Sequence, residues 1–216
     1  MEYYQNPIEE TLYRKLNKDQ SVNRNFQARR VGKCVKLFDD YFQSVSAITP
    51  SDWESYYFES AGIDGYINAV NNISGICSDL DKGTINDYVH FRIIGQTWNG
   101  FINELNVIRE IQNDFPNIDF RKANYELDES YFTDWEAYVN DMLLFGIQIK
   151  PITYKYMNTP YQMRAKENHE VQRELYKKEF GVPHYLFYYQ DNRLYDKEYI
   201  INQINTSLAL KIQVNR

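Results

Sequence analysis

The chain has 216 residues, of which 43% are hydrophobic and 16% aromatic, and it carries a formal net charge of −6. This length and apolar content allow a buried core, as one domain or as a core with a helical extension, and exclude a disordered protein. No stretch has the length and apolarity of a membrane span, and residues 1–6 lack the features of a signal peptide. We therefore expect a cytoplasmic protein with no membrane partner.

Several common kinds of site are excluded by their missing motifs. Cys34 and Cys77 are too few and too far apart for a zinc knuckle, and the three histidines lack metal-ligand spacing. The chain also lacks a Walker A loop, a dinucleotide-binding glycine motif and the nucleophile motif of common serine hydrolases. Nucleotide hydrolysis, dinucleotide binding and that hydrolase class are therefore set aside.

The first part of the chain is predicted to be helical. Its apolar residues recur at helical spacing over residues 8–17, 23–44, 51–60 and 63–72. Ser51, which follows Pro50, is the expected N-cap of the third helix. A further helix over residues 85–96 either stands alone or merges with the next one. We therefore predict a helical N-terminal region over residues 1–95 and a mixed core over residues 96–216.

The next helix brings a carboxylate toward the core. Large apolar residues recur at helical spacing over residues 96–114. At about 100° per residue, Glu104 falls on the flank of this apolar stripe, next to Ile108 and Ile111. Glu104 is therefore either a plain boundary residue or a carboxylate presented to a site. Residues 118–127 then alternate well enough for a first strand, followed by an acidic turn.

Two alternating segments after that turn predict a β-hairpin. Their apolar side chains share one face if Val139 pairs with Leu143, Ala137 with Phe145, Trp135 with Ile147, and Thr133 with Ile149. A two-residue turn at residues 140–141 would shift this pairing by one. The sequence therefore predicts a three-residue turn or a bulge near Met142.

The opposite face of the predicted hairpin gathers Asp134, Glu136, Gln148 and Lys150. Asp134 stands across from Gln148, so a carboxylate and an amide oxygen can reach one Mg²⁺, a hard cation that prefers oxygen ligands. Lys150, one pleat further, can orient a metal-bound water or stabilise charge on a scissile phosphate. The same pattern is equally typical of an ordinary amphipathic hairpin with a polar outer face.

The chain beyond Pro151 completes a mixed core. A tyrosine-rich loop leads into a charged helix over residues 161–180, which ends at Gly181. Residues 184–189 are nearly all apolar or aromatic and predict a buried strand, parallel to its neighbour through the helix crossover. Residues 199–214 form a final helix or strand. From residue 96 onward the order is helix, three strands, helix, strand.

Asp134 and the string Ile147-Gln148-Ile149-Lys150-Pro151 resemble the PD-(D/E)XK nuclease superfamily, and the string is similar to the MjaI-type restriction endonucleases. Gln148 departs from the pattern, since most members have Glu or Asp there. The resemblance covers roughly the last half of the chain. It implies an α/β fold with an αβββαβ core, in which helices flank a central mixed sheet, behind an N-terminal helical region.

The same resemblance implies Mg²⁺-dependent cleavage of double-stranded DNA at a short specific site by a homodimer, with Mn²⁺ able to substitute. The implied site consists of Asp134, Gln148 and the Ile149 carbonyl as metal ligands and Lys150 as the residue that assists the nucleophile. A neutral amide binds a cation less well than a carboxylate, so a compensating acid is expected. Glu104, which would supply a second-site carboxylate, and Glu136 are the two candidates.

The acidic total, with a pI near 5.2, is unusual for a DNA-binding protein, but the charges are unevenly spread. Residues 21–38 include no acidic residue, and a predicted helix there presents a basic ridge of Arg29, Arg30, Lys33 and Lys36. Such a run is usually a solvated face; on a nuclease it would contact phosphates. Beyond the hairpin, Tyr154, Lys155, Arg164 and Lys166 are placed to approach DNA if the fold is right.

Two other functions remain open. A nuclease of the same fold could act in phage defence or repair without strict sequence specificity. A non-catalytic DNA-binding or protein-interaction module could have lost metal affinity through Gln148. Cleavage of plasmid DNA into discrete fragments distinguishes a restriction enzyme from both.

Overall fold

The structure is a computed structural model that describes residues 3–26, 34–45, 47–61 and 63–214. The chain forms two compact units, Met1–Ile102 and Asn103–Arg216. Within the described ranges, no helix combines the length and apolarity that crossing a membrane requires.

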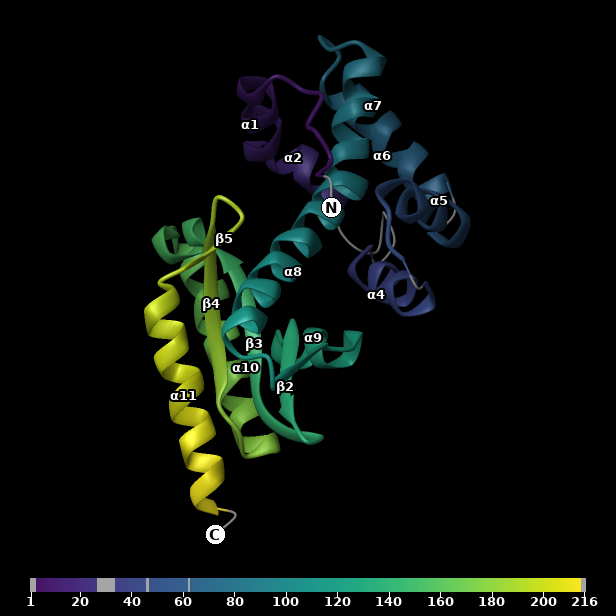
Figure 1. The fold of residues 1–216 in the computed structure, drawn as a ribbon. Helices are drawn as coiled ribbons and strands as arrows, with labels where there is room; N and C mark the ends of the chain where they lie inside the picture. Colours follow the sequence, from purple (N-terminus) through teal and green to yellow (C-terminus); the bar gives the residue numbers. More distant parts are fainter. Residues whose placement is uncertain (1–2, 27–33, 46, 62, 215–216) are drawn as a thin grey trace. The chain divides into compact units, whose positions relative to one another are not determined.

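The first unit is helical, as the sequence predicted (Figure 1). Its elements before the long helix α8 are α1 (Glu10–Lys18), α2 (Gln20–Asn23), the 3-10 helix η1 (Arg24–Phe26), α4 (Cys34–Ser44), α5 (Pro50–Ala61), α6 (Ile63–Ile76), α7 (Lys82–His90) and the π-helix η2 (Phe91–Gly95). Their core is strongly aromatic. Trp53 and Trp98 are fully buried, and the Phe38 ring packs edge-on against both.

The prediction of one continuous helix over residues 23–44 is wrong at its start, because α2 ends there and η1 follows. Asn25 Nδ2 donates to the carbonyls of Ser21 and Val22 (3.0 and 3.2 Å), which are acceptors that a continuing helix would use. Three members of the predicted basic ridge, Arg29, Arg30 and Lys33, lie outside the described residues.

The predicted N-cap of α5 is also corrected. The helix begins at Pro50, which suits a first turn because it needs no acceptor for a backbone N–H. Ser51 lies inside the helix, and the Thr49 hydroxyl accepts a hydrogen bond from the Asp52 N–H (3.1 Å). Thr49 therefore does the capping that the sequence assigned to Ser51.

The helix predicted over residues 85–96 merges with the next one, which confirms the second of the two alternatives. The π-helix η2 joins α7 to α8 (Gln96–Asp114) without a break. Trp53 Nε1 donates to the Ile94 carbonyl within this turn (3.3 Å). The wider turn thus supplies an acceptor to a buried indole in the aromatic core.

The second unit is built on a five-stranded sheet in the order β1-β2-β3-β4-β5. Its elements after α8 are β1 (Asp119–Lys122), α9 (Tyr125–Tyr131), β2 (Trp135–Val139), β3 (Met142–Pro151), η3 (Ile152–Tyr156), α10 (Pro160–Phe180), β4 (His184–Gln190), β5 (Arg193–Tyr195) and α11 (Lys197–Val214). Strands β3 and β4 are parallel, and the other neighbours are antiparallel. The fold is therefore mixed α/β, and the predicted order αβββαβ is present as α8, β1, β2, β3, α10 and β4.

The central part of the predicted hairpin register is confirmed, with Trp135 opposite Ile147 and Ala137 opposite Phe145. The predicted pair Thr133–Ile149 is absent from the ladder. The Thr133 hydroxyl lies 3.0 Å from His184 Nε2, and the Ile149 N–H donates to the side chain of Asp134. The Asp134 N–H still donates to the Ile147 carbonyl (2.8 Å), and side-chain hydrogen bonds take over from the backbone at Thr133 and Ile149.

The outer end of the hairpin differs from the prediction. Residues 140–141 form a two-residue turn with φ of 49° and 60°, conformations that Asn and Asp tolerate well. Val139 consequently faces Met142, not Leu143. The register shift is absorbed by Leu144, an extra residue on β3, so the bulge that the sequence offered as an alternative is present.

The predicted acidic turn before the hairpin is a helix, α9. The first strand ends at Lys122, whereas the sequence predicted it to continue to residue 127. The Asn124 side chain accepts a hydrogen bond from the Leu127 N–H (3.0 Å) and caps the new helix. Acidic residues in the first turn favour a helix start, because they face the positive end of the dipole.

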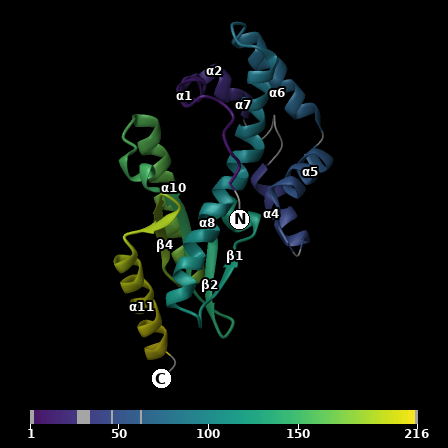
Figure 2. The ribbon, with the colours of Figure 1, turned by 45° about the horizontal axis from the view of Figure 1, so that its top comes forward.

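Different helices cover the two faces of the sheet. The Tyr176 hydroxyl of α10 donates to Glu136 of β2 (2.6 Å), so α10 lies on the face that carries the predicted polar side chains. On the opposite face, the Tyr185 hydroxyl of β4 meets Ser207 of α11 (2.6 Å). Figures 1 and 2 both draw α11 next to β4, and Figure 2 shows β1 at the far edge of the sheet. The polar face of the hairpin is therefore buried under a helix.

Gly146→Ala should destabilise the second unit. A Cβ at Gly146 would lie 2.8 Å from the Tyr176 ring and 2.9 Å from His184 Cδ2. Tyr176 is fully buried and held by Glu136, so overpacking should lower the free energy of unfolding by about 1–3 kcal/mol. Urea denaturation measures this. Gly100→Ala in α8, where a Cβ meets no described atom within 4 Å, should not destabilise the protein.

Candidate active site

Asp134 is fixed at the junction between α9 and the sheet. Phe132 ends α9 with φ of 54°, a left-handed conformation that costs a bulky residue about 1–3 kcal/mol. Two residues on, Asp134 is 5% exposed, and its Oδ2 accepts a hydrogen bond from the Ile149 N–H (2.6 Å). The carboxylate is thus anchored against β3, beside the residue that precedes Lys150.

Lys150 faces this carboxylate, with Nζ 4.0 Å from Asp134 Oδ2. Burial lowers the pKa of Lys150, but the carboxylates of Asp134, Glu104 and Asp128 raise it by more, so that it lies above its ordinary value. Lys150 therefore keeps its proton at neutral pH. It is suited to stabilise negative charge or donate hydrogen bonds, and not to accept a proton.

Glu104 reaches the same region from α8. Its Oε2 lies 3.2 Å from Lys122 Nζ and accepts a hydrogen bond from Trp135 Nε1 (3.4 Å). Burial raises the pKa of Glu104 to about 7; Asp134 raises it too, whereas Lys122 and Lys150 oppose the shift. The helical position that made Glu104 a candidate thus places it in the electrostatic field of both Asp134 and Lys150.

Asp128 is a further acid of this region that the sequence did not single out. It lies on α9, and burial, followed by the charge of Asp134, raises its pKa, against the opposing effect of Lys122 and Lys150. The signal that could have found it is the helix start at Asn124, which places the acidic cluster on an element that ends at the site.

Glu136 is occupied by tyrosines. It is 8% exposed, and its two oxygens accept hydrogen bonds from the Tyr176 and Tyr138 hydroxyls (2.6 and 2.7 Å). Of the two candidate compensating acids, Glu104 is the one that lies near Lys150, whereas Glu136 secures the packing of α10 on the sheet.

Gln148 is fully buried, and its Oε1 accepts a hydrogen bond from Arg173 Nη1 of α10 (3.1 Å). No sequence pattern pointed to Arg173, because 25 residues separate the two partners. Gln148 Nε2 is buried and has no hydrogen-bond partner among the described residues. The amide that the sequence assigned to a metal therefore contacts a guanidinium.

Two of the residues predicted to approach DNA are engaged within the protein. Tyr154 is 8% exposed, and its hydroxyl lies 2.9 Å from His169 Nδ1. Lys166 Nζ donates to the carbonyls of Lys155 and Met157 (3.0 and 2.7 Å), which secures the loop before α10. Both residues thus support the segment that follows the hairpin.

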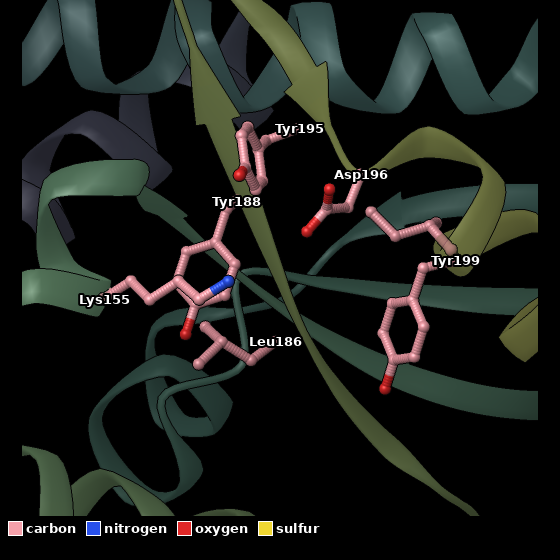
Figure 3. Close-up of a pocket in the computed structure, with 7 residues that line it drawn as sticks. Lys155, Leu186, Tyr188, Tyr195, Asp196 and Tyr199 are labelled. Carbon is pink, nitrogen blue, oxygen red and sulfur yellow. The ribbon is translucent and has the colours of Figure 1, made fainter.

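Lys155 and Arg164 are exposed. Lys155 borders a pocket of about 270 Å³ whose other lining residues are Leu186, Tyr188, Tyr195, Asp196, Tyr199 and Ile200. Figure 3 shows Lys155 and Tyr199 entering from opposite sides. In the first unit, Lys36 of the predicted basic ridge forms an ion pair with Asp40 one turn along (2.6 Å).

The acids of this centre do not form a closed cage. In the part of the chain that the structure describes, no three His, Cys, Asp or Glu side chains are close enough to hold a metal ion by themselves. The charge of Asp134 nevertheless raises the pKa of both Glu104 and Asp128. The arrangement is an open group of oxygen donors beside a protonated lysine.

Comparison with known proteins places the chain in a family. The family model of the MjaI restriction endonuclease matches residues 16–206, which include most of the helical unit and the Asp134–Lys150 centre. Comparisons with curated proteins and with solved structures each found no match. The chain belongs to the MjaI restriction endonuclease family and is a type II site-specific DNA endonuclease.

Proposed function

We propose that the protein hydrolyses double-stranded DNA at a short specific site with Mg²⁺, using the active-site pattern of the PD-(D/E)XK superfamily. The observation that carries this proposal is the buried Asp134, held by the Ile149 N–H with Lys150 Nζ 4.0 Å away. A carboxylate and a protonated lysine at one end of a hairpin suit phosphodiester cleavage, since one binds a cation and the other stabilises negative charge.

The donor set fits Mg²⁺, which is usually held by one or two carboxylates and keeps several waters. Asp134 and Glu104 would supply carboxylate oxygens, and Ile149 its carbonyl oxygen. The raised pKa of Glu104, about 7, supports this assignment, because a nearby cation favours the charged form that burial disfavours. Mn²⁺ prefers similar ligands and should substitute.

A bound cation supplies Lewis-acid polarisation of the phosphate and acidifies a water molecule. Lys150 keeps its proton and donates to the attacking water or to a phosphoryl oxygen, so it stabilises charge as the new phosphorus–oxygen bond forms and the bond to the leaving sugar oxygen breaks. The hydrogen bond that Asp134 accepts from the Ile149 N–H fixes the direction in which this carboxylate presents its oxygens.

Two further features belong to the proposal. Symmetric cutting of the two strands of a duplex in one complex uses two centres, and a symmetric homodimer provides them. The DNA contacts outside the centre are assigned to the basic ridge, Arg29, Arg30, Lys33 and Lys36, and to Lys155 and Arg164. The exposure of the last two supports their role.

Incubation of the protein with plasmid DNA tests this function. Discrete fragments are expected with Mg²⁺ or Mn²⁺, and no cutting in EDTA, because the centre needs a cation to polarise the phosphate. A continuous smear would instead indicate a nuclease without strict specificity. Binding of duplex without cleavage by any divalent ion would exclude the proposed chemistry. Light scattering of the protein with DNA measures whether it is a dimer.

A further inference from the structure

Arg173 and Gln148 form a contact that fixes the direction of the buried amide. A guanidinium can only donate hydrogen bonds, so the amide oxygen must face Arg173 Nη1 (3.1 Å). The reversed amide would place its N–H₂ group against the guanidinium, two donors in contact. Gln148 is fully buried, so no solvent can take the place of this partner.

This orientation makes the amide oxygen a poor site for a divalent cation. A metal ion at Gln148 Oε1 would lie close to the positive charge of Arg173, and such a repulsion is strong where water is excluded. Gln148 Nε2, which has no partner among the described residues, cannot bind a cation because it carries only donor hydrogens. The orientation of the Gln148 amide is thus set by Arg173 and not by a metal ion.

The basic residues Lys150, Lys122 and Arg173 differ in what they face. Lys150 faces Asp134 at 4.0 Å and Lys122 faces Glu104 at 3.2 Å. Arg173 faces two neutral groups, the Gln148 amide and the Tyr154 hydroxyl. Among the described residues, no carboxylate lies within ion-pair distance of Arg173. No described carboxylate in direct contact therefore neutralises its charge, which can attract an external anion.

Arg173 also lies near the reacting centre. Burial lowers the pKa of His169, and the charges of Lys150 and Arg173 lower it further, while Asp134 opposes them. The pKa of this imidazole on α10 thus depends on the charges of Lys150, Arg173 and Asp134. The Arg173 side chain is half-buried, so part of it can reach a ligand.

We propose that Arg173 binds a backbone phosphate of the DNA next to the phosphate that is cut, and that Gln148 is the positioning residue that holds the guanidinium there. This inference rests on the proposed nuclease function. A carboxylate at residue 148 would neutralise Arg173, whereas an amide holds it without removing its charge. The amide that replaces the usual acid therefore adds a phosphate contact to the site.

Binding of sheared plasmid DNA in EDTA tests the phosphate contact without cleavage. Arg173→Gln should lower affinity about tenfold and reduce the slope of log affinity against log salt by about 0.9, the value for one lost contact. Arg173→Lys should restore the slope and part of the affinity, because it keeps the charge but not the planar fork. Lys178→Gln, which removes an exposed cation from the same helix, should bind like wild type. Equal losses in both glutamine variants would overturn the assignment.

Gln148→Glu tests the positioning role. The new carboxylate should pair with Arg173 and reduce the salt slope although the arginine is still present, and Arg173→Gln should then add little further loss. If Gln148→Glu instead lowers the Mg²⁺ concentration needed for cleavage and leaves EDTA binding unchanged, Gln148 is a metal ligand and the inference is wrong.

Thermal unfolding checks each variant. If Arg173→Gln fails to fold, the salt slopes of DNA binding by Arg173→Lys and Gln148→Glu still test the phosphate contact. A wild type that binds but never cuts contradicts the proposed function alone. A wild type that cuts, with unchanged binding by a folded Arg173→Gln variant, contradicts this inference alone.

Discussion

Asp134→Asn should lower the rate of plasmid cleavage by about 1,000-fold or more, since metal-ion stabilisation of developing charge is worth several kcal/mol. The substitution keeps the size of the side chain, and the amide oxygen can still accept from the Ile149 N–H. The loss should therefore reflect a missing negative charge and not a broken fold. Single-turnover cleavage at saturating Mg²⁺ measures it.

Asp141→Asn is the matched control for this variant. Asp141 belongs to the turn of the same hairpin, is exposed and pairs with Arg121 at the surface (2.6 Å). Asn tolerates its positive φ of 60°, so folding and cleavage should stay near wild type. Cleavage at the wild-type rate by a folded Asp134→Asn variant would remove Asp134 from the chemistry, whereas family membership would stand.

The hairpin shows how far alternation of side chains predicts structure. Trp135 and Ala137 pair as expected because the apolar set must lie on one face, and a slip by one residue would expose all of it. At the turn the sequence left a three-residue turn and a bulge near Met142 as alternatives, and the structure has a two-residue turn with a bulge at Leu144. The apolar pattern could not choose between them, because both keep the same pairs.

Contacts made by tertiary packing explain what the sequence could not predict. The position of Glu104 near Asp134 and Lys150 could be predicted, because one helix alone determines on which flank of the apolar stripe this residue lies. Arg173 was not found, because its partner is on β3 and the contact depends on how α10 packs across the sheet. Asp128 was not singled out, because the first strand was predicted to continue past the helix cap at Asn124 and the acidic residues after it were assigned to a turn.

Cleavage at limiting Mg²⁺ should depend on pH through Glu104. Burial raises the pKa of this carboxyl from 4.5 to about 7, so the charged form is present above that pH and is lost below it. If this carboxylate holds the cation, the rate should fall about tenfold per pH unit below the midpoint. Higher Mg²⁺ should move the midpoint to lower pH, because a bound cation favours the charged form.

Glu104→Gln should cleave slowly at all pH values and lose this pH dependence.

A second measurement, of stability against pH, does not depend on cleavage activity. Between pH 4.5 and about 7 the folded wild type keeps a proton on Glu104 that the unfolded chain releases, so this group's contribution to stability falls as pH rises. The stability of Glu104→Gln, measured by thermal unfolding, should therefore not show this decrease between pH 4.5 and about 7.

The combined results distinguish the roles of this carboxylate. A changed stability profile with an unchanged pH–rate profile would mean that Glu104 is a buried acid paired with Lys122 and not a ligand. Loss of the pH dependence together with a higher Mg²⁺ requirement would establish Glu104 as the acid that takes the metal-binding role of the glutamate replaced by Gln148. The buried helix flank would then supply the charge that the hairpin lacks.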